Sequence, residues 1–240
     1  MEYVTQALDG SDINPEFAIK VLQEMALINI VKEDRRLWMH DLIEEMADRL
    51  WFHEDVHDVL TENTGTNKVK GIIVKLPKAS KIFLSAKCFK KMKNLQLFIN
   101  VNARFSGEVH YLPNQLRFLD WPGCPLHFLP SNFNPKRLVT LNIPRSQTSR
   151  FGGGLQSFPH LKSMNLEGCK SLTEVPNLSR MFPSLEDLCL RWCTSLAELH
   201  PSVVSLEKLV YIDLRGCHNL TMFPRTDNST SLKSVPYRLH

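Results

Sequence analysis

The sequence predicts an α/β chain in which a small helix–hairpin–helix module precedes a solenoid built on a curved parallel sheet. Two observations predict this division. The pattern Leu-x-x-(Leu/Met/Ile)-x-Leu-x-x-Cys-x-x-Leu begins at Leu161, Leu185 and Leu209, at a constant interval of 24 residues. The N-terminal part lacks this pattern and shows helical spacing on either side of two short extended runs. We expect the module at residues 1–50, a linker at 51–68 and the solenoid at 69–240.

The repeat keeps its register column by column. One column holds leucine and the next holds cysteine, at Leu166, Leu190 and Leu214 and at Cys169, Cys193 and Cys217. A single coil of this kind cannot bury its own apolar face, so successive coils must stack and pair their strands into a parallel sheet. The spacing and the leucine positions are typical of a leucine-rich-repeat solenoid.

Weaker copies of the repeat precede the regular ones. They begin at Val69, Leu95, Leu116 and Leu138, with intervals that start at 26 residues and become regular only later. After Pro224 the chain runs through a stretch of loop composition, Asp227-Asn228-Ser229-Thr230-Ser231. Since a solenoid needs an atypical final coil to cover its last apolar face, we expect the repeat domain to be incomplete at its C-terminal end.

Four of the six cysteines fall in one repeat column, which favours a packing role over disulfide pairing. A thiol in that column can fill a small buried site and donate weakly to a loop carbonyl. The alternative for Cys189, Cys193, Cys217 and His218 is a zinc site. Their spacing follows the repeat and not a paired Cys-x-x-Cys pattern, so we expect no metal site.

The N-terminal module has the outline of a winged helix. Asn14 followed by Pro15 is a helix start, and apolar residues then recur at helical spacing. Residues 27–31 and 37–39 predict two strands around a charged turn, and a second helix is expected from about Asp41. Winged helices often bind DNA, but residues 1–60 hold five Lys or Arg against fourteen Asp or Glu, and this net charge would repel phosphates. We therefore expect no nucleic-acid partner.

The two parts of the chain differ in charge. Residues 61–240 hold 24 basic against 11 acidic residues, and nine lysines lie between Lys68 and Lys93. Two interpretations stay open. Both surfaces can simply be solvated, or the acidic module can dock on the basic entrance of the solenoid.

Several classes of protein are disfavoured by the sequence. The chain contains no apolar run long enough to cross a bilayer and no signal-peptide pattern at its start, so we expect no membrane partner and a cytoplasmic location, with the nucleus as a second compartment. We find no nucleophile with a base, no pair of carboxylates placed for catalysis and no metal-ligand spacing, so we expect no enzyme.

The repeat register predicts which side chains face outward from the sheet. In the last two regular repeats these are Arg191, Trp192, Tyr211, Asp213 and Arg215. Arginine and aromatic residues are enriched at the energetic centres of protein interfaces. We expect these five residues to form a protein-binding face.

Several strings of the chain resemble one family. Met39-His40-Asp41-Leu42-Ile43 after a short hairpin, Leu50-Trp51-Phe52-His53-Glu54-Asp55-Val56 and Asn63-Thr64-Gly65-Thr66 are similar to the winged-helix end and linker of plant intracellular disease-resistance receptors. Tyr111-Leu112-Pro113 and Leu119-Asp120-Trp121 look like the start of their repeats. The resemblance is to the Toll/interleukin-receptor class of nucleotide-binding leucine-rich-repeat proteins, and it covers almost the whole chain.

The resemblance implies a molecular switch in plant defence. In this family the nucleotide-binding region holds ADP at rest, and the repeats restrain the switch until a pathogen molecule is sensed. Carried over by motif, His40 would contact the ADP phosphate, with Met39 and Asp41 shaping the turn and the helix start. The implied partners are a protein ligand, either a pathogen effector or a guarded host protein, and the receptor's own nucleotide-binding region.

The chain also departs from the family pattern. It contains no Gly-x-x-x-x-Gly-Lys-(Ser/Thr) phosphate-binding loop, and Gly152-Gly153-Gly154 has no following lysine. We therefore expect ADP or ATP to bind only in the context of a full-length receptor. The alternative is a stand-alone repeat adaptor or decoy without nucleotide sensing, which would be favoured if no phosphate-binding loop were encoded upstream.

Overall fold

The computed structural model describes residues 28–31, 36–39, 53–74, 76, 80–151, 157–221 and 224 of the chain, with side chains from residue 57 onwards. Strands β1 (Ile28–Val31) and β2 (Arg36–Met39) form an antiparallel hairpin in which Ile28 lies opposite Met39. This confirms the hairpin predicted from two short apolar runs. The helices expected on either side of it lie outside the described residues.

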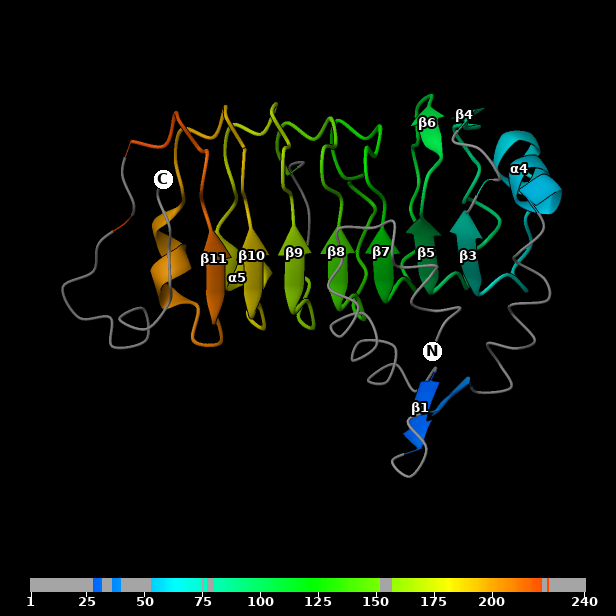
Figure 1. The fold of residues 1–240 in the computed structure, drawn as a ribbon, viewed down its shortest axis with the longest axis horizontal. Helices are drawn as coiled ribbons and strands as arrows, with labels where there is room; N and C mark the ends of the chain where they lie inside the picture. The colour runs from blue at the N-terminus through cyan, green and yellow to red at the C-terminus, as the bar shows by residue number, and fades with distance from the viewer. Residues whose placement is uncertain are drawn as a thin grey trace.

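A seven-stranded parallel sheet runs along the solenoid (Figure 1). Each of the seven repeats expected from the sequence contributes one strand, and each strand pairs with the strand of the next coil. In sheet order from the N-terminal end they are β3 (Gly71–Val74), β5 (Leu97–Asn100), β7 (Phe118–Asp120), β8 (Thr140–Asn142), β9 (Ser163–Asn165), β10 (Asp187–Cys189) and β11 (Tyr211–Asp213).

The apolar columns are in register from coil to coil. The middle residues of neighbouring strands are directly paired, for example Leu188 with Met164 on one side and Ile212 on the other. In the adjacent column Leu166 and Leu190 are fully buried, and their backbone amides donate to carbonyl groups of the next strand. Burying a leucine contributes roughly 1.5–3 kcal/mol. The stacked leucines predicted from the sequence thus form the core.

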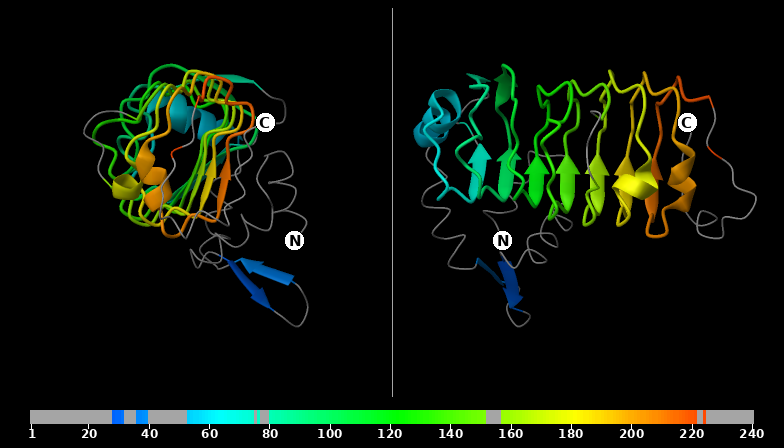
Figure 2. Two further views of the ribbon diagram at one scale, coloured as in Figure 1. Left: turned by 90° about the vertical axis from the view of Figure 1, so that its left-hand side faces the viewer. Right: turned by 180° about the vertical axis from the view of Figure 1, so that it is seen from behind.

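The side of the coil opposite the sheet is closed by short helical turns. Helix α5 (Leu178–Met181) and the 3-10 helix η1 (Pro201–Ser205) contact each other there, and the end-on view in Figure 2 shows them across the ring from the strands. Phe133, Phe158 and Phe182 stack beneath this side, with ring centroids 5.8 and 5.5 Å apart. Phenylalanine therefore forms a second internal column besides leucine.

The N-terminal end of the solenoid is covered by a helix. Helix α4 (His53–Glu62) lies in the stretch expected as a linker, yet it contacts β3 and the short strand β4 (Lys81–Phe83), which pairs in parallel with β6 (Arg104–Ser106). Its residue Leu60 is fully buried and belongs to the hydrophobic core. A terminal element of this kind covers the apolar end that a solenoid otherwise exposes.

The cysteine column has the packing role predicted for it. All six cysteines are free thiols. Three of them lie within hydrogen-bond distance of a carbonyl oxygen of the preceding coil, Cys169 with Ile143 at 3.4 Å, Cys193 with Leu166 at 3.1 Å and Cys217 with Leu190 at 3.0 Å. The column therefore links successive coils through weak S–H donors.

Among the described helices, none has both the length and the apolar character required to cross a bilayer.

Candidate protein-binding face

The outer face of the sheet is formed by strand side chains that alternate with the buried middle column. On β11 these side chains belong to Tyr211 and Asp213, and parallel pairing places Asp213 beside Cys189 of β10. Arg191 and Arg215 each lie two residues after the last residue of β10 and β11, respectively. The residues predicted to form the binding face therefore lie on or just after the last two strands that the structure describes.

Asp213 and Arg215 form a closely bonded pair on this face. The Arg215 guanidinium donates from Nε to Asp213 Oδ1 at 2.9 Å and from Nη2 to Oδ2 at 2.5 Å, and the Arg215 amide donates to Oδ1 at 3.0 Å. Tyr211 adds a hydrogen bond from its hydroxyl to Oδ2 at 3.2 Å. Burial raises the pKa of the Asp213 carboxyl, but the Arg215 hydrogen bonds outweigh it and hold that pKa below its ordinary value. The carboxylate thus fixes the positions of an arginine and a tyrosine.

The five selected residues differ in what they offer to a partner. Trp192 is 48% exposed and Tyr211 is 38% exposed, so both present aromatic surface to solvent. Asp213 is only 4% exposed and acts as the support for Arg215 instead of a contact residue. The accessible part of this face is therefore aromatic and cationic.

Arg191 is held by the preceding coil. Its Nη2 and Nε donate to Glu167 Oε1 at 2.6 and 3.2 Å. Glu167 stands one repeat earlier at the corresponding position after its strand, so this ion pair bridges two coils. Because the pair is partly exposed to water, its contribution to stability is small, but it orients the guanidinium.

Trp192 adopts the left-handed backbone conformation, with φ +60°. The corresponding position of the other coils from β7 onward has the same conformation, in Gly123, Arg145, Gly168 and Gly216, with φ between +55° and +76°. The Trp192 ring lies over Gly216 and meets the His218 ring edge to face, with ring centroids 6.0 Å apart. The tryptophan is therefore anchored by the coil that follows it.

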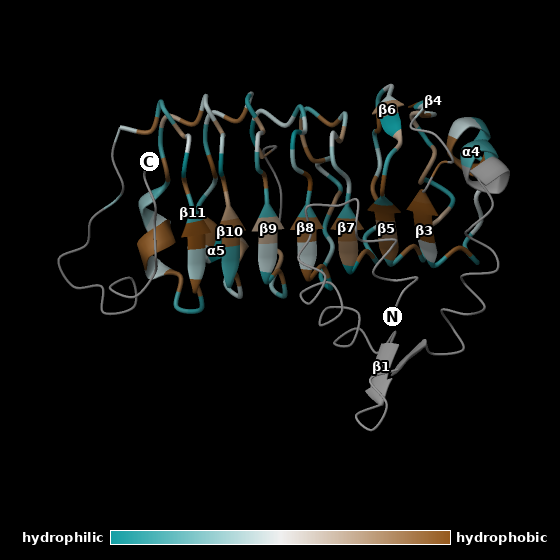
Figure 3. Ribbon diagram, viewed as in Figure 1, coloured by the Kyte–Doolittle hydropathy of each residue, from teal (hydrophilic) through white to brown (hydrophobic). Residues whose placement is uncertain are grey.

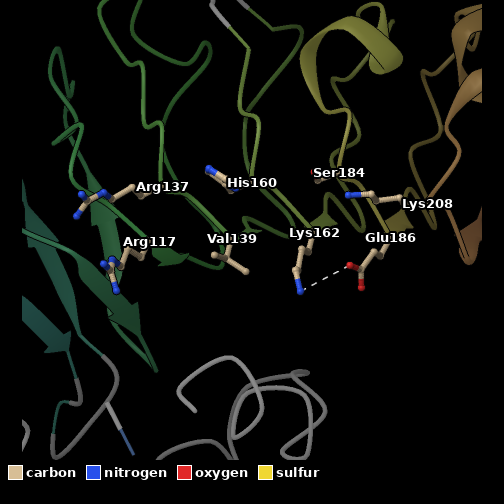
Figure 4. A pocket seen from close by; sticks show the side chains of 8 residues that line it. All are labelled: Arg117, Arg137, Val139, His160, Lys162, Ser184, Glu186 and Lys208. Atoms are coloured by element: carbon tan, nitrogen blue, oxygen red, sulfur yellow. Dashed lines mark ion pairs between the residues drawn. The ribbon is translucent and has the colours of Figure 1, made fainter. Parts of the chain in front are cut away.

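A basic groove lies beside the N-terminal ends of the strands (Figure 4). It has a volume of about 440 Å³ and is lined by Arg117, Arg137, Val139, His160, Lys162, Ser184, Glu186 and Lys208. Glu186 is its only acidic residue, and its Oε1 lies 3.7 Å from Lys162 Nζ. The groove would favour an acidic segment of a partner.

The predicted nucleotide contact falls at the edge of the described chain. Met39 is the last residue of β2 in the hairpin, whereas His40 and Asp41 lie outside the described residues. Within the described ranges, no group of three or more His, Cys, Asp or Glu side chains is placed to hold a metal ion.

Comparison with known proteins agrees with the sequence motifs. Residues 1–55 match the family described as the winged-helix domain of Roq1-like disease resistance proteins. The chain is 36% identical over 234 residues to the Arabidopsis thaliana protein SUPPRESSOR OF npr1-1, CONSTITUTIVE 1, which covers 89% of the chain and 16% of that protein. It is 29% identical over 236 residues to TMV resistance protein N of Nicotiana glutinosa, covering 93% of the chain and 20% of that protein. The chain is homologous to plant disease-resistance proteins.

The homology to disease-resistance proteins confirms the resemblance drawn from the motifs, and it extends over both parts of the chain. The chain spans about a fifth or less of the length of these relatives. A solved structure supports the fold separately. The leucine-rich repeat domain of the type III effector XopL aligns with a TM-score of 0.51 over 97% of this chain and 85% of that chain, at 19% identity.

Two features of this disease-resistance homologue were not anticipated from the sequence. The first is an apolar outer face at the N-terminal end of the sheet, where Leu97, Ile99 and Phe118 are buried although they flank the inward side chains. Figure 3 shows most of β3 and β5 in brown, whereas more white and teal appears on the strands from β8 onwards. Unlike the polar strands near the C-terminal end, β3 and β5 do not alternate apolar and polar residues, and this run of apolar residues was the available signal.

The second feature is the left-handed position that follows each strand from β7 onward. The Gly-Cys pairs at 123–124, 168–169 and 216–217 indicate it, because glycine adopts this conformation without a steric cost. Arg145 and Trp192 break the pattern, so the sequence alone does not identify the position in their coils.

Proposed function

We propose that this chain is the winged-helix end and first repeats of a non-catalytic plant immune receptor. In this proposal the repeats serve protein recognition and restraint of the receptor, and the winged helix belongs to an ADP-sensing switch. The relatives that support the proposal are disease-resistance proteins, and the fold is a leucine-rich-repeat solenoid. The implied partners are a pathogen effector or guarded host protein and the receptor's own nucleotide-binding region.

The observation that carries this proposal is the division of the outer face into two halves. Around Leu97, Ile99 and Phe118 the outer face is apolar, which suits a lasting contact within one receptor. Around Trp192 and Tyr211 it is aromatic, cationic and partly exposed, which suits a partner that binds and leaves. We assign restraint of the switch to the first half and recognition to the second.

Recognition is tested by substitution in the full-length receptor. Trp192→Ala together with Arg215→Ala should abolish the defence response to the pathogen molecule that triggers the unmodified receptor. Phe83→Ala together with Lys170→Ala is the matched control, because Phe83 is the most exposed large apolar residue of the described chain and lies on β4, away from this face. An unchanged response of the Trp192 and Arg215 variant, at equal protein level, would remove these residues from the recognition surface.

The switch is tested through His40. In the proposal its imidazole donates a hydrogen bond to a phosphate oxygen of ADP in the complete receptor. In the sequence His40 follows Met39, the last residue of β2. His40→Ala in the full-length receptor should lower the amount of ADP that co-purifies with the protein. A variant that retains as much ADP as the unmodified receptor would contradict the assignment.

A further inference from the structure

A lysine-rich hollow lies at the N-terminal end of the solenoid, away from the predicted protein-binding face. It has a volume of about 590 Å³. Two segments form it, the loop that follows α4 and the turns that precede β5. Its lining residues are Asn63, Gly65, Thr66, Asn67, Lys87, Lys90, Lys91 and Lys93.

The two segments are fixed against each other by hydrogen bonds and close packing. The Lys93 amide donates to Asn67 Oδ1 at 3.3 Å, and Asn94 Nδ2 donates to the Asn67 carbonyl oxygen at 2.9 Å. Gly65 lies so close to the buried Met92 side chain that a Cβ atom there would be 2.6 Å from Met92 Cγ. The floor of the hollow is therefore held in one arrangement before any ligand arrives.

The charge of the hollow is not neutralised. Its lining contains four lysines and no carboxylate. Within the part of the chain that the structure describes, none of the four lysines forms an ion pair, and Glu62 at the end of α4 forms none with them. The basic groove of Figure 4 differs in this respect, because Glu186 lies within it beside Lys162. Ammonium groups that gather without a counter-charge repel one another, and an anion between them relieves this repulsion.

We propose that this hollow binds a compact ligand that carries several phosphate groups. Lysine ammonium groups are strong point-charge donors to phosphate, and four of them match a ligand with more than one phosphate. The volume is within the range of small-molecule sites, so the ligand is compact and not an extended polymer. The asparagine and threonine residues of the loop supply further polar groups. The same chemistry occurs in a soluble polyphosphate and in a phosphorylated lipid headgroup.

Binding is measured on the full chain by calorimetry with tripolyphosphate as the soluble probe, and by co-sedimentation with vesicles that contain phosphatidylinositol bisphosphate. The test variant replaces Lys90, Lys91 and Lys93 by alanine. The matched control replaces Lys81, Lys136 and Lys170, which are exposed lysines outside the lining of both basic sites, and changes the net charge equally. Since all six side chains are exposed, both variants should unfold at the temperature of the unmodified chain.

The expected result is binding of the unmodified chain and of the control variant, with at least a tenfold loss of affinity in the test variant and weaker binding at high salt. Binding of tripolyphosphate indicates a soluble ligand, and binding of the vesicles alone indicates a lipid headgroup. Equal losses of affinity in both variants would show that binding depends only on net charge, and this would overturn the proposal. Absence of binding to both probes at low salt, or binding of a DNA oligonucleotide but of neither probe, would also overturn it.

Discussion

The Trp192 ring lies directly over the Cα atom of Gly216, one coil further along the solenoid. A Cβ atom added to Gly216 would be 2.3 Å from Trp192 Cε3, well inside the contact distance of two carbon atoms. Both residues adopt the left-handed conformation at the equivalent position of their coils. The pair therefore joins two coils at the point where the predicted recognition surface is most exposed, and the glycine is required by the tryptophan.

Replacing Gly216 by alanine should destabilise the solenoid. The added methyl group collides with the Trp192 ring, and alanine is strained at a positive φ. We therefore expect a loss of roughly 2–4 kcal/mol in the free energy of unfolding. Urea unfolding monitored by circular dichroism measures it. Gly123→Ala is the matched control, since Gly123 has φ +66° but no atom within 4 Å of the added Cβ, and it should cost about 1–2 kcal/mol. Equal losses at the two glycines would show that the tryptophan contact contributes nothing.

The protein should be more stable with a hydrogen-bond donor in the cysteine column than with an apolar side chain. Cys193→Ala removes the S–H donor to the Leu166 carbonyl oxygen and leaves a small cavity, with an expected loss of about 1–2 kcal/mol. Cys193→Ser keeps a donor and should lose less stability, since the column already holds a hydroxyl at Ser146, which there donates to Thr148 Oγ1. Thermal unfolding of the two variants ranks them. If Cys193→Ser is less stable than Cys193→Ala, the hydrogen bond does not account for the stabilising role of this column.

Asp120 should make the stability of the protein depend on pH. Burial raises the pKa of this carboxyl to about 7, although a hydrogen bond from Asn142 Nδ2 at 2.6 Å opposes the shift. The folded chain therefore retains a proton that the unfolded chain releases near its ordinary pKa, so stability falls as pH rises from about 4 to 7. The total loss is on the order of 4 kcal/mol. Urea unfolding at pH 4, 5.5, 7 and 8 measures this slope.

Asp120→Asn is the control for this pH dependence. An asparagine can still accept the hydrogen bond from Asn142 and cannot ionise, so the variant should be more stable than the unmodified chain at pH 8 and should show a flatter pH profile. A profile that stays as steep in the variant would assign the pH dependence to other groups.

The thiols should react slowly and in a defined order. Cys189 is the only cysteine that is not buried, and its pKa is raised to about 11 by burial of part of its surface. Burial raises the pKa of Cys124 to about 12. A thiol reagent at pH 8 should therefore label Cys189 first, with a rate that rises towards pH 11, and should label Cys124 only after unfolding. Loss of the fast phase in Cys189→Ser checks this order, and a fast phase that persists there would contradict it.

The repeat determined most of the solenoid from sequence alone. The three regular repeats and their four weaker copies predicted the number of strands and their parallel order, because leucines at similar intervals can be buried only by stacking coils. The repeat also placed Leu166, Leu190 and Leu214 in one column and assigned the cysteines to packing. The hairpin was predictable from local pattern, because two extended runs joined by a charged turn have few other arrangements.

Only the tertiary structure decided the character of each surface. The repeat register predicts that Asp213 and Arg191 both face outward. In the structure Asp213 is buried beneath Arg215, and Arg191 is bound to Glu167 of the preceding coil. Helix α4, in the stretch expected as a linker, covers the end of the core, and the loop that follows it forms one hollow with the lysine-rich turns at residues 87–93. The period of the sequence predicts which side chains face the core, because every coil must place apolar residues at the same inward positions. Whether a charge is paired, an apolar end is covered or two loops meet depends on residues elsewhere in the solenoid. These contacts exist only once the chain has folded.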